Sequence, residues 1–166
     1  MMVIWIVGMS GSGKSYLAKR LKKKITILSN KIKWIDGDKF RERYSKDLGY
    51  SLKDRKINSR RIQKHCLKYF KKGYIVICSI LSIFPSHQKK NAKIFKNKYF
   101  QIYIKVSIGK LKKRDNKKIY SKKKQVVGKN IIFPKPYKSD LVIKNNFNKT
   151  FLKNLRPIVD KIYEKI

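Results

Sequence analysis

Short runs of apolar, mostly β-branched residues alternate along the chain with longer segments in which apolar residues recur at helical spacing. Within each short run the apolar residues are continuous rather than alternating, which is typical of strands buried on both faces of a parallel sheet. The pattern therefore predicts an α/β domain of three layers with a five-stranded, mostly parallel sheet. Its strands would be Val3–Val7, Ile32–Ile35, Tyr74–Ile80, Phe100–Val106 and Leu141–Ile143.

The ends of three helices can also be placed from the sequence. An apolar stripe within Ser15–Lys24 predicts a first helix with a basic outer face. Ser51 and Asp54 have the spacing of a capping box, and a helix that opens there would end at Gly73, a suitable left-handed cap. A last helix should begin beside Pro157, because proline is tolerated only in a first turn.

Length and charge narrow the function classes. With 166 residues the chain is long enough for one core, so residues 1–166 are expected to form a single domain. The 45 Lys and Arg against 9 Asp and Glu give a net charge of +36, which invites a nucleic-acid or membrane interpretation. The lysines are spread over the whole chain and accompany many Ile and Asn, so we interpret them as compositional drift on a solvated surface. Nucleic acid is therefore not an expected partner.

Nothing in the sequence indicates export or a membrane. No apolar run reaches the roughly 18 residues that a membrane span needs, and no signal-like segment opens the chain. Cys66 and Cys78 offer neither a disulfide framework nor metal-ligand spacing. A reduced, cytoplasmic setting is expected.

The segment GMSGSGKS follows the first predicted strand and opens the first predicted helix. It satisfies the Walker A pattern, in which glycines let backbone N–H groups turn inward around a β-phosphate at a helix N-terminus. Its lysine would reach the β- and γ-phosphates and its last serine would hold Mg²⁺. We therefore expect a nucleoside triphosphate to bind at Gly8, Ser10, Gly11, Ser12, Gly13, Lys14 and Ser15.

Two carboxylates, Asp36 and Asp38, end the second predicted strand. The carboxyl ends of parallel strands line the ligand crevice, so both side chains should face the phosphate loop. One of them could take a proton from an attacking hydroxyl, and the other could order the Mg²⁺ shell or the loop. An acidic turn in solvent is the alternative, and it is disfavoured because the chain has only 9 acidic residues.

Four stretches together resemble the adenylylsulfate kinase (APS kinase) family, from Val3 to about residue 146: GMSGSGKS, IDGDKFRERYSKDLGYSLKDRKINSRRI, RDNKKIY and PYKSDLVI. The second stretch is the most specific, because it is long and matches in register without gaps. The resemblance implies a P-loop kinase with a short lid at about 115–130. It also implies transfer of the ATP γ-phosphoryl group to the 3′-hydroxyl of adenosine 5′-phosphosulfate (APS), with Mg²⁺.

The resemblance also assigns roles to residues. Asp36 matches the acid placed near the acceptor hydroxyl, and the expected catalytic residues are Lys14, Asp36 and Ser82. The expected Mg²⁺ ligands are Ser15, from the Walker A pattern, and Asp38, from the strand-end carboxylates. Arg114 matches an arginine near the ATP base or phosphates. Arg55 and Asn58 share a helix face and could grip an anion or ribose, and an arginine fork suits a phosphosulfate bridge. The residues that match the family's acceptor site are Asp36, Asp38, Arg41, Tyr50 (Phe in the family), Arg55, Asn58 and Ser82.

Two regions depart from the family pattern. Ser82 aligns with a family serine regarded as a phosphoserine intermediate, but the neighbouring proline is displaced and the arginine is absent. We favour a hydrogen-bonding role for Ser82, since phosphoryl transfer needs positioning and charge rather than a covalent step. The lid is shorter than in the family. A lysine among residues 122–124 could supply its cation, or this stretch could be a solvated basic loop.

Several functions stay open at this point. APS is the expected acceptor, and the departures also suit a branch of the same family that phosphorylates cytidine diphosphoramidate in capsule biosynthesis. A nucleic-acid-associated P-loop protein and an inactive kinase relative are further alternatives. The paired aspartates and the Arg55/Asn58 helix favour an enzyme, because a binding protein has no need of them. The resemblance also allows a homodimer.

Overall fold

The central sheet has five strands, all parallel, in the order β2-β3-β1-β4-β5. The computed structural model describes residues 1–27, 29–115, 118–122, 125–148, 151, 153 and 155–165. The predicted three-layer α/β class is confirmed, and the sheet is parallel throughout rather than mostly parallel. The strands are β1 (Met2–Val7), β2 (Ile32–Asp36), β3 (Ile75–Ile80), β4 (Tyr99–Lys105) and β5 (Leu141–Lys144).

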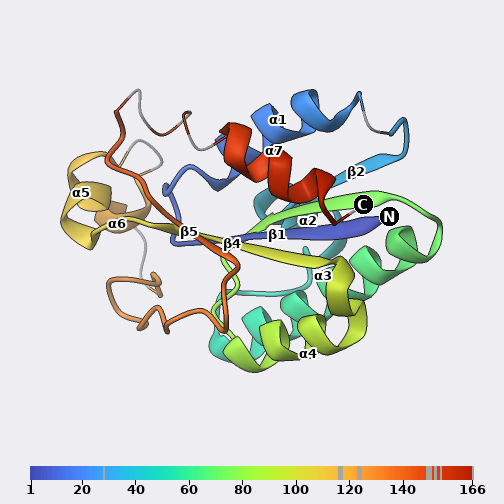
Figure 1. Ribbon diagram of the computed structural model, residues 1–166. Helices are drawn as coiled ribbons and strands as arrows, with labels where there is room; N and C mark the ends of the chain where they lie inside the picture. The colour runs from blue at the N-terminus through green and yellow to red at the C-terminus, as the bar shows by residue number, and fades with distance from the viewer. Residues whose placement is uncertain are drawn as a thin grey trace.

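Helices cover both faces of the sheet (Figure 1). Helices α1 and α7 lie on one face, and α3 and α4 lie on the other. Among the described residues the helices are α1 (Lys14–Ile25), α2 (Gly37–Tyr44), α3 (Leu52–Lys71), α4 (Pro85–Phe95), the 3₁₀ turn η1 (Lys96–Lys98), α5 (Ile108–Lys113), α6 (Ile119–Lys122) and α7 (Leu155–Tyr163). None of these helices is both long and apolar enough to cross a bilayer.

Strand β1 explains why the apolar runs are continuous. All six of its residues are buried, and alternate side chains enter two different cores. Met2, Ile4 and Ile6 belong to the core beneath α1 and α7. The odd-numbered residues between them, such as Trp5, belong to the core beneath α3 and α4. A strand buried on both faces has no solvent side on which polar residues would be tolerated.

The helix ends follow the local sequence. Ser51 caps α3 by accepting a hydrogen bond from the backbone N–H of Asp54 at 3.1 Å, and its hydroxyl donates to the Asp54 carboxylate at 2.7 Å. Gly73 has φ +81°, as predicted for the residue that ends this helix. Pro157 lies in the first turn of α7. Helix α2 was not predicted, and it begins directly after β2 with Asp36 as its N-cap.

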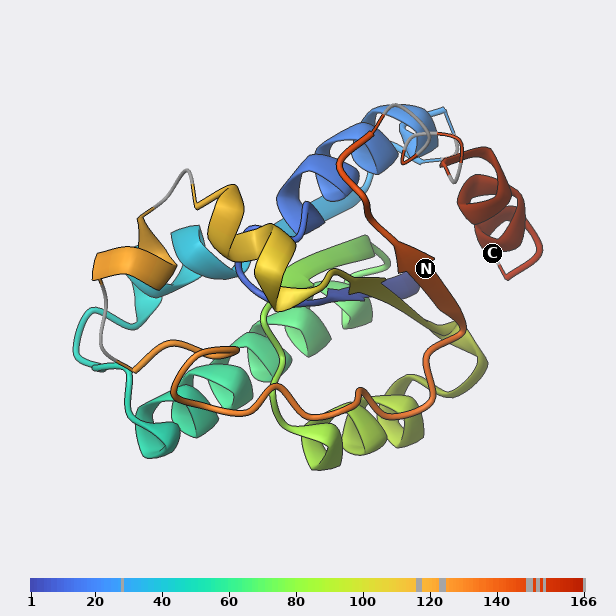
Figure 2. The same ribbon diagram turned by 90° about the vertical axis from the view of Figure 1, so that its left-hand side faces the viewer.

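Figure 2 looks onto the carboxyl ends of the strands. The phosphate loop leaves β1 there and enters α1, and α2 leaves the carboxyl end of β2, which β3 separates from β1 in the sheet. Helices α5 and α6 border the same end of the sheet (Figure 2). The connections that carry predicted site residues therefore lie together at the carboxyl end of the sheet. Open parallel sheets bind their ligands in the crevice at this end.

Candidate active site

A cleft of about 1090 Å³ opens at the carboxyl ends of the strands. It is bordered by the phosphate loop, the β2–α2 junction, one face of α3, the segment after β3 and the residues that follow α6. The residues predicted for the acceptor site, Asp36, Asp38, Arg41, Tyr50, Arg55, Asn58 and Ser82, all line it. Of the predicted phosphate-loop residues, Ser10, Gly11, Gly13, Lys14 and Ser15 line the cleft, whereas Gly8 and Ser12 are buried behind it.

The phosphate loop has the backbone shape that its glycines predict. At Gly8, φ is +155° and a Cβ would come within 2.7 Å of the Ile104 carbonyl oxygen, so no side chain fits. Gly13, with φ +99°, stands at the N-cap position of α1 without a side chain to cap it. The N-terminus of α1 borders the cleft through Lys14 and Ser15, which is where a helix binds an anion. The Lys14 ammonium donates to the Met9 carbonyl oxygen at 2.7 Å.

Two residues that the sequence analysis missed hold this loop from outside. The buried Asn145 donates through Nδ2 to the Ser12 carbonyl oxygen at 2.9 Å. The Tyr120 hydroxyl donates to the Ser10 carbonyl oxygen at 2.8 Å. Burial, and then the nearby Asp115 charge, raise the pKa of Tyr120 to about 12, so this hydroxyl stays a donor at neutral pH. Asn145 directly follows β5. Because ligands bind at the carboxyl ends of parallel strands, its position in the sequence could have indicated a role at the site.

Asp36 connects the phosphate loop to α2. Its Oδ2 accepts hydrogen bonds from the hydroxyls of Ser15 at 2.5 Å and Ser79 at 3.1 Å. Its Oδ1 accepts from the backbone N–H groups of Asp38 at 3.2 Å and Lys39 at 3.4 Å. Asp36, rather than Asp38, therefore accepts the hydrogen bond from Ser15, the serine expected to hold Mg²⁺. Asp38 is exposed in the first turn of α2 and lines the cleft.

Two arginines meet at one aromatic ring on the far side of the cleft. The guanidinium carbons of Arg41 and Arg55 lie 4.8 Å and 5.5 Å from the centre of the Tyr50 ring. Arg55 also donates to the carbonyl oxygens of Tyr50 and Gln125, both at 2.9 Å. Burial, and then the charge of Arg41, lower the pKa of Arg55 from its ordinary value. Two cations this close repel each other, so an anionic ligand between them would be favoured.

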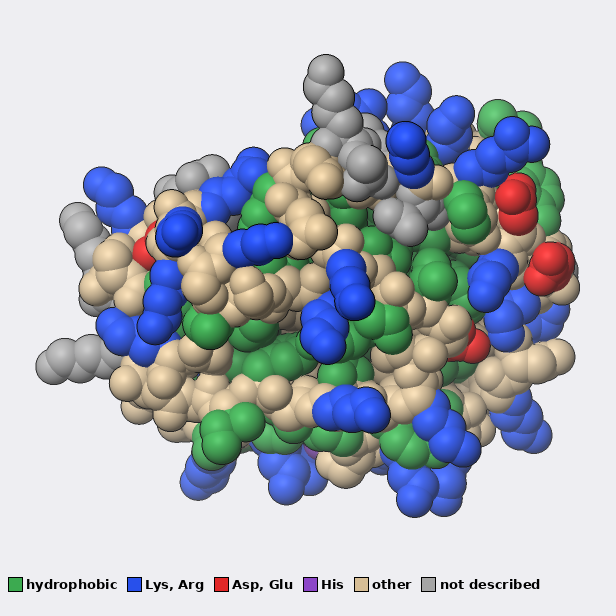
Figure 3. Space-filling model, turned by 60° about the vertical axis from the view of Figure 1, so that its left-hand side comes forward, with side chains coloured by type: hydrophobic (Ala, Val, Ile, Leu, Met, Phe, Trp, Pro, Cys, Tyr) green, Lys and Arg blue, Asp and Glu red, His purple; other side chains and the backbone are tan. Residues whose placement is uncertain are grey.

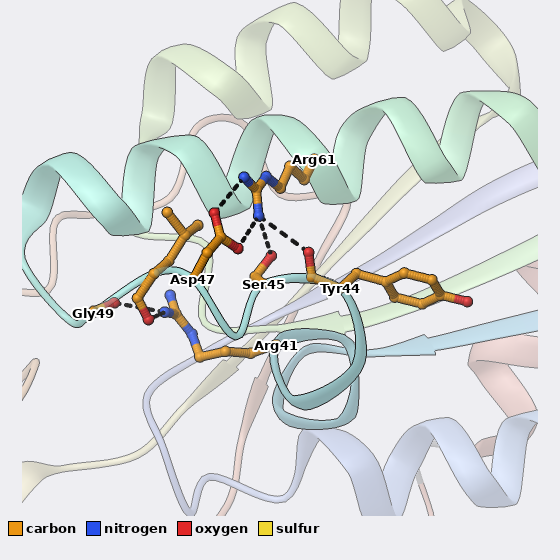
Figure 4. A network of polar contacts seen from close by, with 7 residues as sticks. Arg41, Tyr44, Ser45, Asp47, Gly49 and Arg61 are labelled. Carbon is orange, nitrogen blue, oxygen red and sulfur yellow. Dashed lines mark hydrogen bonds and ion pairs between the residues drawn. The ribbon is translucent and has the colours of Figure 1, made fainter.

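The segment that carries Tyr50 is held by a network of polar contacts (Figure 4). Arg61, on α3, donates to both carboxylate oxygens of Asp47, at 2.6 Å and 2.7 Å, and to the Tyr44 carbonyl oxygen at 3.1 Å. Arg41, on α2, donates to the Gly49 carbonyl oxygen at 2.6 Å. The loop between α2 and α3 is therefore fixed from both helices. The sequence contains the aspartate and the arginine but does not show that they pair.

Ser82 follows β3 in a strained backbone conformation, with φ +50°. Its Oγ accepts hydrogen bonds from Trp5 Nε1 and from Gln88 Nε2, both at 3.2 Å. The same Gln88 nitrogen donates to the Ser82 carbonyl oxygen at 2.7 Å. Because a hydroxyl oxygen has two lone pairs, both are engaged here, and the hydroxyl hydrogen is left to donate. This arrangement suits a hydrogen-bond donor better than a nucleophile.

A buried chain of amides lies behind Ser82, and the sequence analysis missed it. Gln88 Oε1 accepts from the Tyr137 backbone N–H at 2.7 Å. Gln101 Nε2 lies 3.4 Å from the same Oε1, and Gln101 Oε1 accepts from the Tyr99 hydroxyl at 2.8 Å. Gln101 is completely buried in β4, next to the central strand. A glutamine within an apolar strand is the signal that could have indicated this network.

Helices α3 and α4 contribute a further polar pair, Ser59 and the partly buried His87, that sequence reasoning did not single out. Ser59 lines the cleft, and its Oγ lies 2.8 Å from Nδ1 of His87. The neighbouring Asn58 is only 9% exposed, and its Oδ1 has no hydrogen-bond partner among the described residues.

Arg114 lies apart from the cleft lining. It follows α5 as its C-cap, is exposed, and its guanidinium carbon lies 4.5 Å from the centre of the Phe147 ring. Its neighbour Asp115 caps α6 by accepting from the backbone N–H of Ile119 at 2.7 Å. The predicted lid cation cannot be placed, because residues 123 and 124 and the side chain of Lys122 lie outside the described residues.

The described basic side chains form no stripe on one face of the molecule (Figure 3). On the face drawn in Figure 3, Lys and Arg side chains are scattered around the molecule and do not gather in one stripe. A nucleic-acid surface would concentrate them along a groove or a helix.

Comparisons with known proteins agree with this geometry. The family model described as Adenylylsulphate kinase matches residues 1–144. The chain is 30% identical over 167 residues to the adenylyl-sulfate kinase of Clostridium acetobutylicum, which covers 98% of this chain and 81% of that protein. It is 39% identical over 82 residues to the adenylyl-sulfate kinase of Bacillus licheniformis, which covers 49% of this chain and 42% of that protein.

The chain is also 37% identical to the adenylyl-sulfate kinase of Bacillus pumilus. It spans less than half the length of these two Bacillus relatives, 42% of the Bacillus licheniformis protein and 44% of the Bacillus pumilus protein. Among solved structures, the Mycobacterium tuberculosis APS kinase CysC in complex with AMPPNP and APS superposes with a TM-score of 0.87. It is 23% identical and covers 98% of this chain and 97% of that chain, which supports the fold. From the family model over residues 1–144 and the similarity to the clostridial kinase along nearly the whole chain, we conclude that the chain belongs to the adenylylsulphate kinase family.

Proposed function

We propose that the protein transfers the γ-phosphoryl group of ATP to the 3′-hydroxyl of APS. The observation that carries this proposal is one continuous cleft with a phosphate loop at one end and two arginines around an aromatic ring at the other. Two carboxylates, Asp36 and Asp38, line the cleft between them. Such a layout places the donor phosphate on one side of the two carboxylates and the anionic acceptor on the other. The carboxylates between them can accept a proton and help to bind a metal ion.

ATP would be held through its phosphates by the α1 N-terminus and Lys14. The Ser15 hydroxyl and the Asp36 carboxylate, 2.5 Å apart, are hard oxygen donors of the kind that Mg²⁺ prefers, so these residues fit the ion. When bound, Mg²⁺ would neutralise charge on the transferring phosphates. Arg114 stands beside the segment that supports Ser12, and we assign it to the ATP base side.

The contacts of Asp36 favour exchanging the roles expected for the two aspartates. Both Asp36 oxygens already accept hydrogen bonds, and one of those bonds comes from Ser15. Asp36 would thus order the metal side of the site. Asp38 points from the first turn of α2 into the cleft, and we assign it to the acceptor hydroxyl, whose proton it would take as phosphoryl transfer proceeds.

Ser82 is expected to remain unphosphorylated during turnover, because both lone pairs of its Oγ already accept hydrogen bonds. Incubation with γ-labelled ATP in the absence of acceptor should leave no label on Ser82 in peptide mass spectrometry. Ser82→Ala should lower kcat by about 10²-fold, the usual cost of one lost transition-state donor, rather than abolish turnover. Stoichiometric phosphoserine formed at a rate that matches kcat would contradict this role.

Arg61→Met should raise the KM for the acceptor by about threefold and leave kcat and the KM for ATP nearly unchanged. Arg61 does not itself line the cleft, but it contacts the cleft-lining Ser45 and fixes the segment that carries Tyr50 (Figure 4). Arg156→Met, which removes the same charge from an exposed position of α7, is the matched control. Steady-state kinetics with each substrate varied separately measure the effect. Equal kinetics in both variants would show that the network does not position Tyr50.

A panel of acceptors tests the proposed function directly. The protein is incubated with ATP, Mg²⁺ and APS, cytidine diphosphoramidate, free sugars or single-stranded DNA, and the products are identified by mass spectrometry. We expect a 3′-phosphonucleotide from APS. A phosphate on a sugar, a protein or a polynucleotide, with no 3′-phosphonucleotide formed, contradicts the proposal.

A cytidylyl acceptor is the second candidate. It is favoured by the departures from the family pattern in the Ser82–Ser86 segment, of which Ser82, Ile83 and Phe84 line the cleft. A phosphosulfate and a phosphoramidate bridge differ little in size, so the base would decide between the two acceptors. The same panel separates them. A nucleic-acid-binding role would instead appear as DNA affinity that falls steeply with added salt.

A further inference from the structure

One wall of the cleft carries two adjacent buried polar side chains. Asn58 and Ser59, on α3, are 9% and 8% exposed, and both line the cleft. The cleft lining also includes the apolar side chains of Ile62, Ile83, Phe84, Val126 and Val127. A cleft that combines apolar side chains with a few buried polar groups has the character of a site for an aromatic base with a polar edge.

The buried side-chain oxygen of Asn58 lacks a hydrogen-bond donor among the described residues. A buried amide without partners is costly, so a ligand that supplies an N–H or O–H group there gains affinity. A phosphosulfate bridge presents only acceptor oxygens at neutral pH. The nucleoside part of the acceptor, rather than its bridge, therefore belongs at this wall, while Arg41 and Arg55 suit the bridge.

Ser59 is held in place by a residue from another helix. Its Oγ lies 2.8 Å from Nδ1 of His87, and the His87 ring packs against the cleft-lining Phe84 with ring centres 5.2 Å apart. Burial, followed by the positive charges of Arg60, Lys56 and Lys90, lowers the pKa of His87 below 6.5. The imidazole is consequently neutral at pH 7. The charges that lower this pKa are all positive, and no hydrogen bond joins the His87 ring to a carboxylate within the described part of the chain, so a nucleophilic role for Ser59 has no support here.

We propose that Ser59, positioned by His87, selects the acceptor nucleotide by accepting a hydrogen bond from an exocyclic amino group of its base. Whichever His87 tautomer is present, Ser59 Oγ keeps at least one lone pair for an N–H donor. Adenine and cytosine both carry such an amino group, whereas purine without a 6-substituent does not. This inference rests on the proposed function, since it concerns the acceptor of the same reaction.

The test compares APS with the corresponding phosphosulfate of purine riboside, which lacks the 6-amino group. We expect the wild-type protein to prefer APS by about tenfold or more in kcat/KM, mainly through KM. In Ser59→Ala the preference should fall to within about twofold, with the KM for ATP unchanged. Alanine is a better helix former than serine, so this variant should fold. Asn30→Ala, at an exposed position before β2 and outside the cleft lining, is the control and should keep the wild-type preference.

His87 is tested as a positioning residue through two replacements. His87→Leu removes the contact with Ser59 and should lower the preference for APS, and adding Ser59→Ala should cause no further loss. His87→Asn places an amide group near the position of Nδ1 and should retain most of the preference. Additive losses in the double variant would overturn the positioning role, because independent effects add.

The outcomes separate this inference from the proposed function. Wild-type transfer to APS with a preference that Ser59→Ala leaves intact overturns the inference alone. If only the cytidylyl acceptor of the panel is used, the same comparison is made with its analogue lacking the 4-amino group, and an unchanged preference again overturns the inference. Absence of transfer to every nucleotide in the panel overturns both.

Discussion

Lys14→Ala should lower kcat by about 10³-fold with the acceptor at saturation. The lysine is the first helical residue of α1 and its ammonium already lies against the phosphate loop, 2.7 Å from the Met9 carbonyl oxygen. It would be the nearest fixed cation to the transferring phosphoryl group, and a preorganised charge in that position contributes mainly to the transition state. Initial rates of ADP formation with varied ATP measure the loss.

Lys19→Ala is the matched control for this experiment. Lys19 is exposed on the same helix, so its replacement removes one positive charge near the loop without touching the cleft lining. In a chain with a net charge of +36 that single charge should have little effect on turnover. If ADP formation by Lys14→Ala stayed within about threefold of wild type, the assignment of the phosphate loop would be wrong.

The two aspartates should give separable defects. Asp36→Asn should lower kcat by about 10²-fold or more and raise the Mg²⁺ concentration needed for half-maximal rate, because the carboxylate beside Ser15 loses its charge. Its melting temperature should change little, since asparagine remains a good N-cap for α2. Asp38→Asn should lower kcat by a similar factor with an unchanged Mg²⁺ requirement.

Magnesium titrations of the three proteins at saturating substrates distinguish these roles. A larger shift in Mg²⁺ requirement for Asp38→Asn than for Asp36→Asn would restore the assignment made from the sequence. Small and equal effects at both positions would remove both carboxylates from the chemistry.

The sheet could be predicted because its strands are buried on both faces, which leaves continuous apolar runs such as Val3–Val7 within an otherwise lysine-rich chain. Local chemistry also placed the ends of α3, through Ser51 and Gly73. Helix α2 was missed because eight residues with one buried side chain, Phe40, carry almost no periodic signal.

The sequence indicated which residues line the candidate site, but it indicated few of the contacts between them. The motifs identified Asp36 and Asp38, but their spacing alone does not reveal which carboxylate oxygen meets Ser15. Contacts between distant segments, such as Ser59 with His87, carry no local signature at all. They depend on how α4 is set against α3, and that is decided by packing over the whole sheet.

The amide chain behind Ser82 constrains how this protein can change over evolutionary time. Gln88 and Gln101 meet in the interior, and each also serves a second group, Ser82 and Tyr99. An apolar replacement of either glutamine alone leaves a buried donor or acceptor unpaired, at a cost of about 1–3 kcal/mol. Replacing both together, with matching changes at their other partners, removes much of that penalty. Substitutions at these positions should therefore be epistatic, and lineages that lose one glutamine should be found to have lost the other.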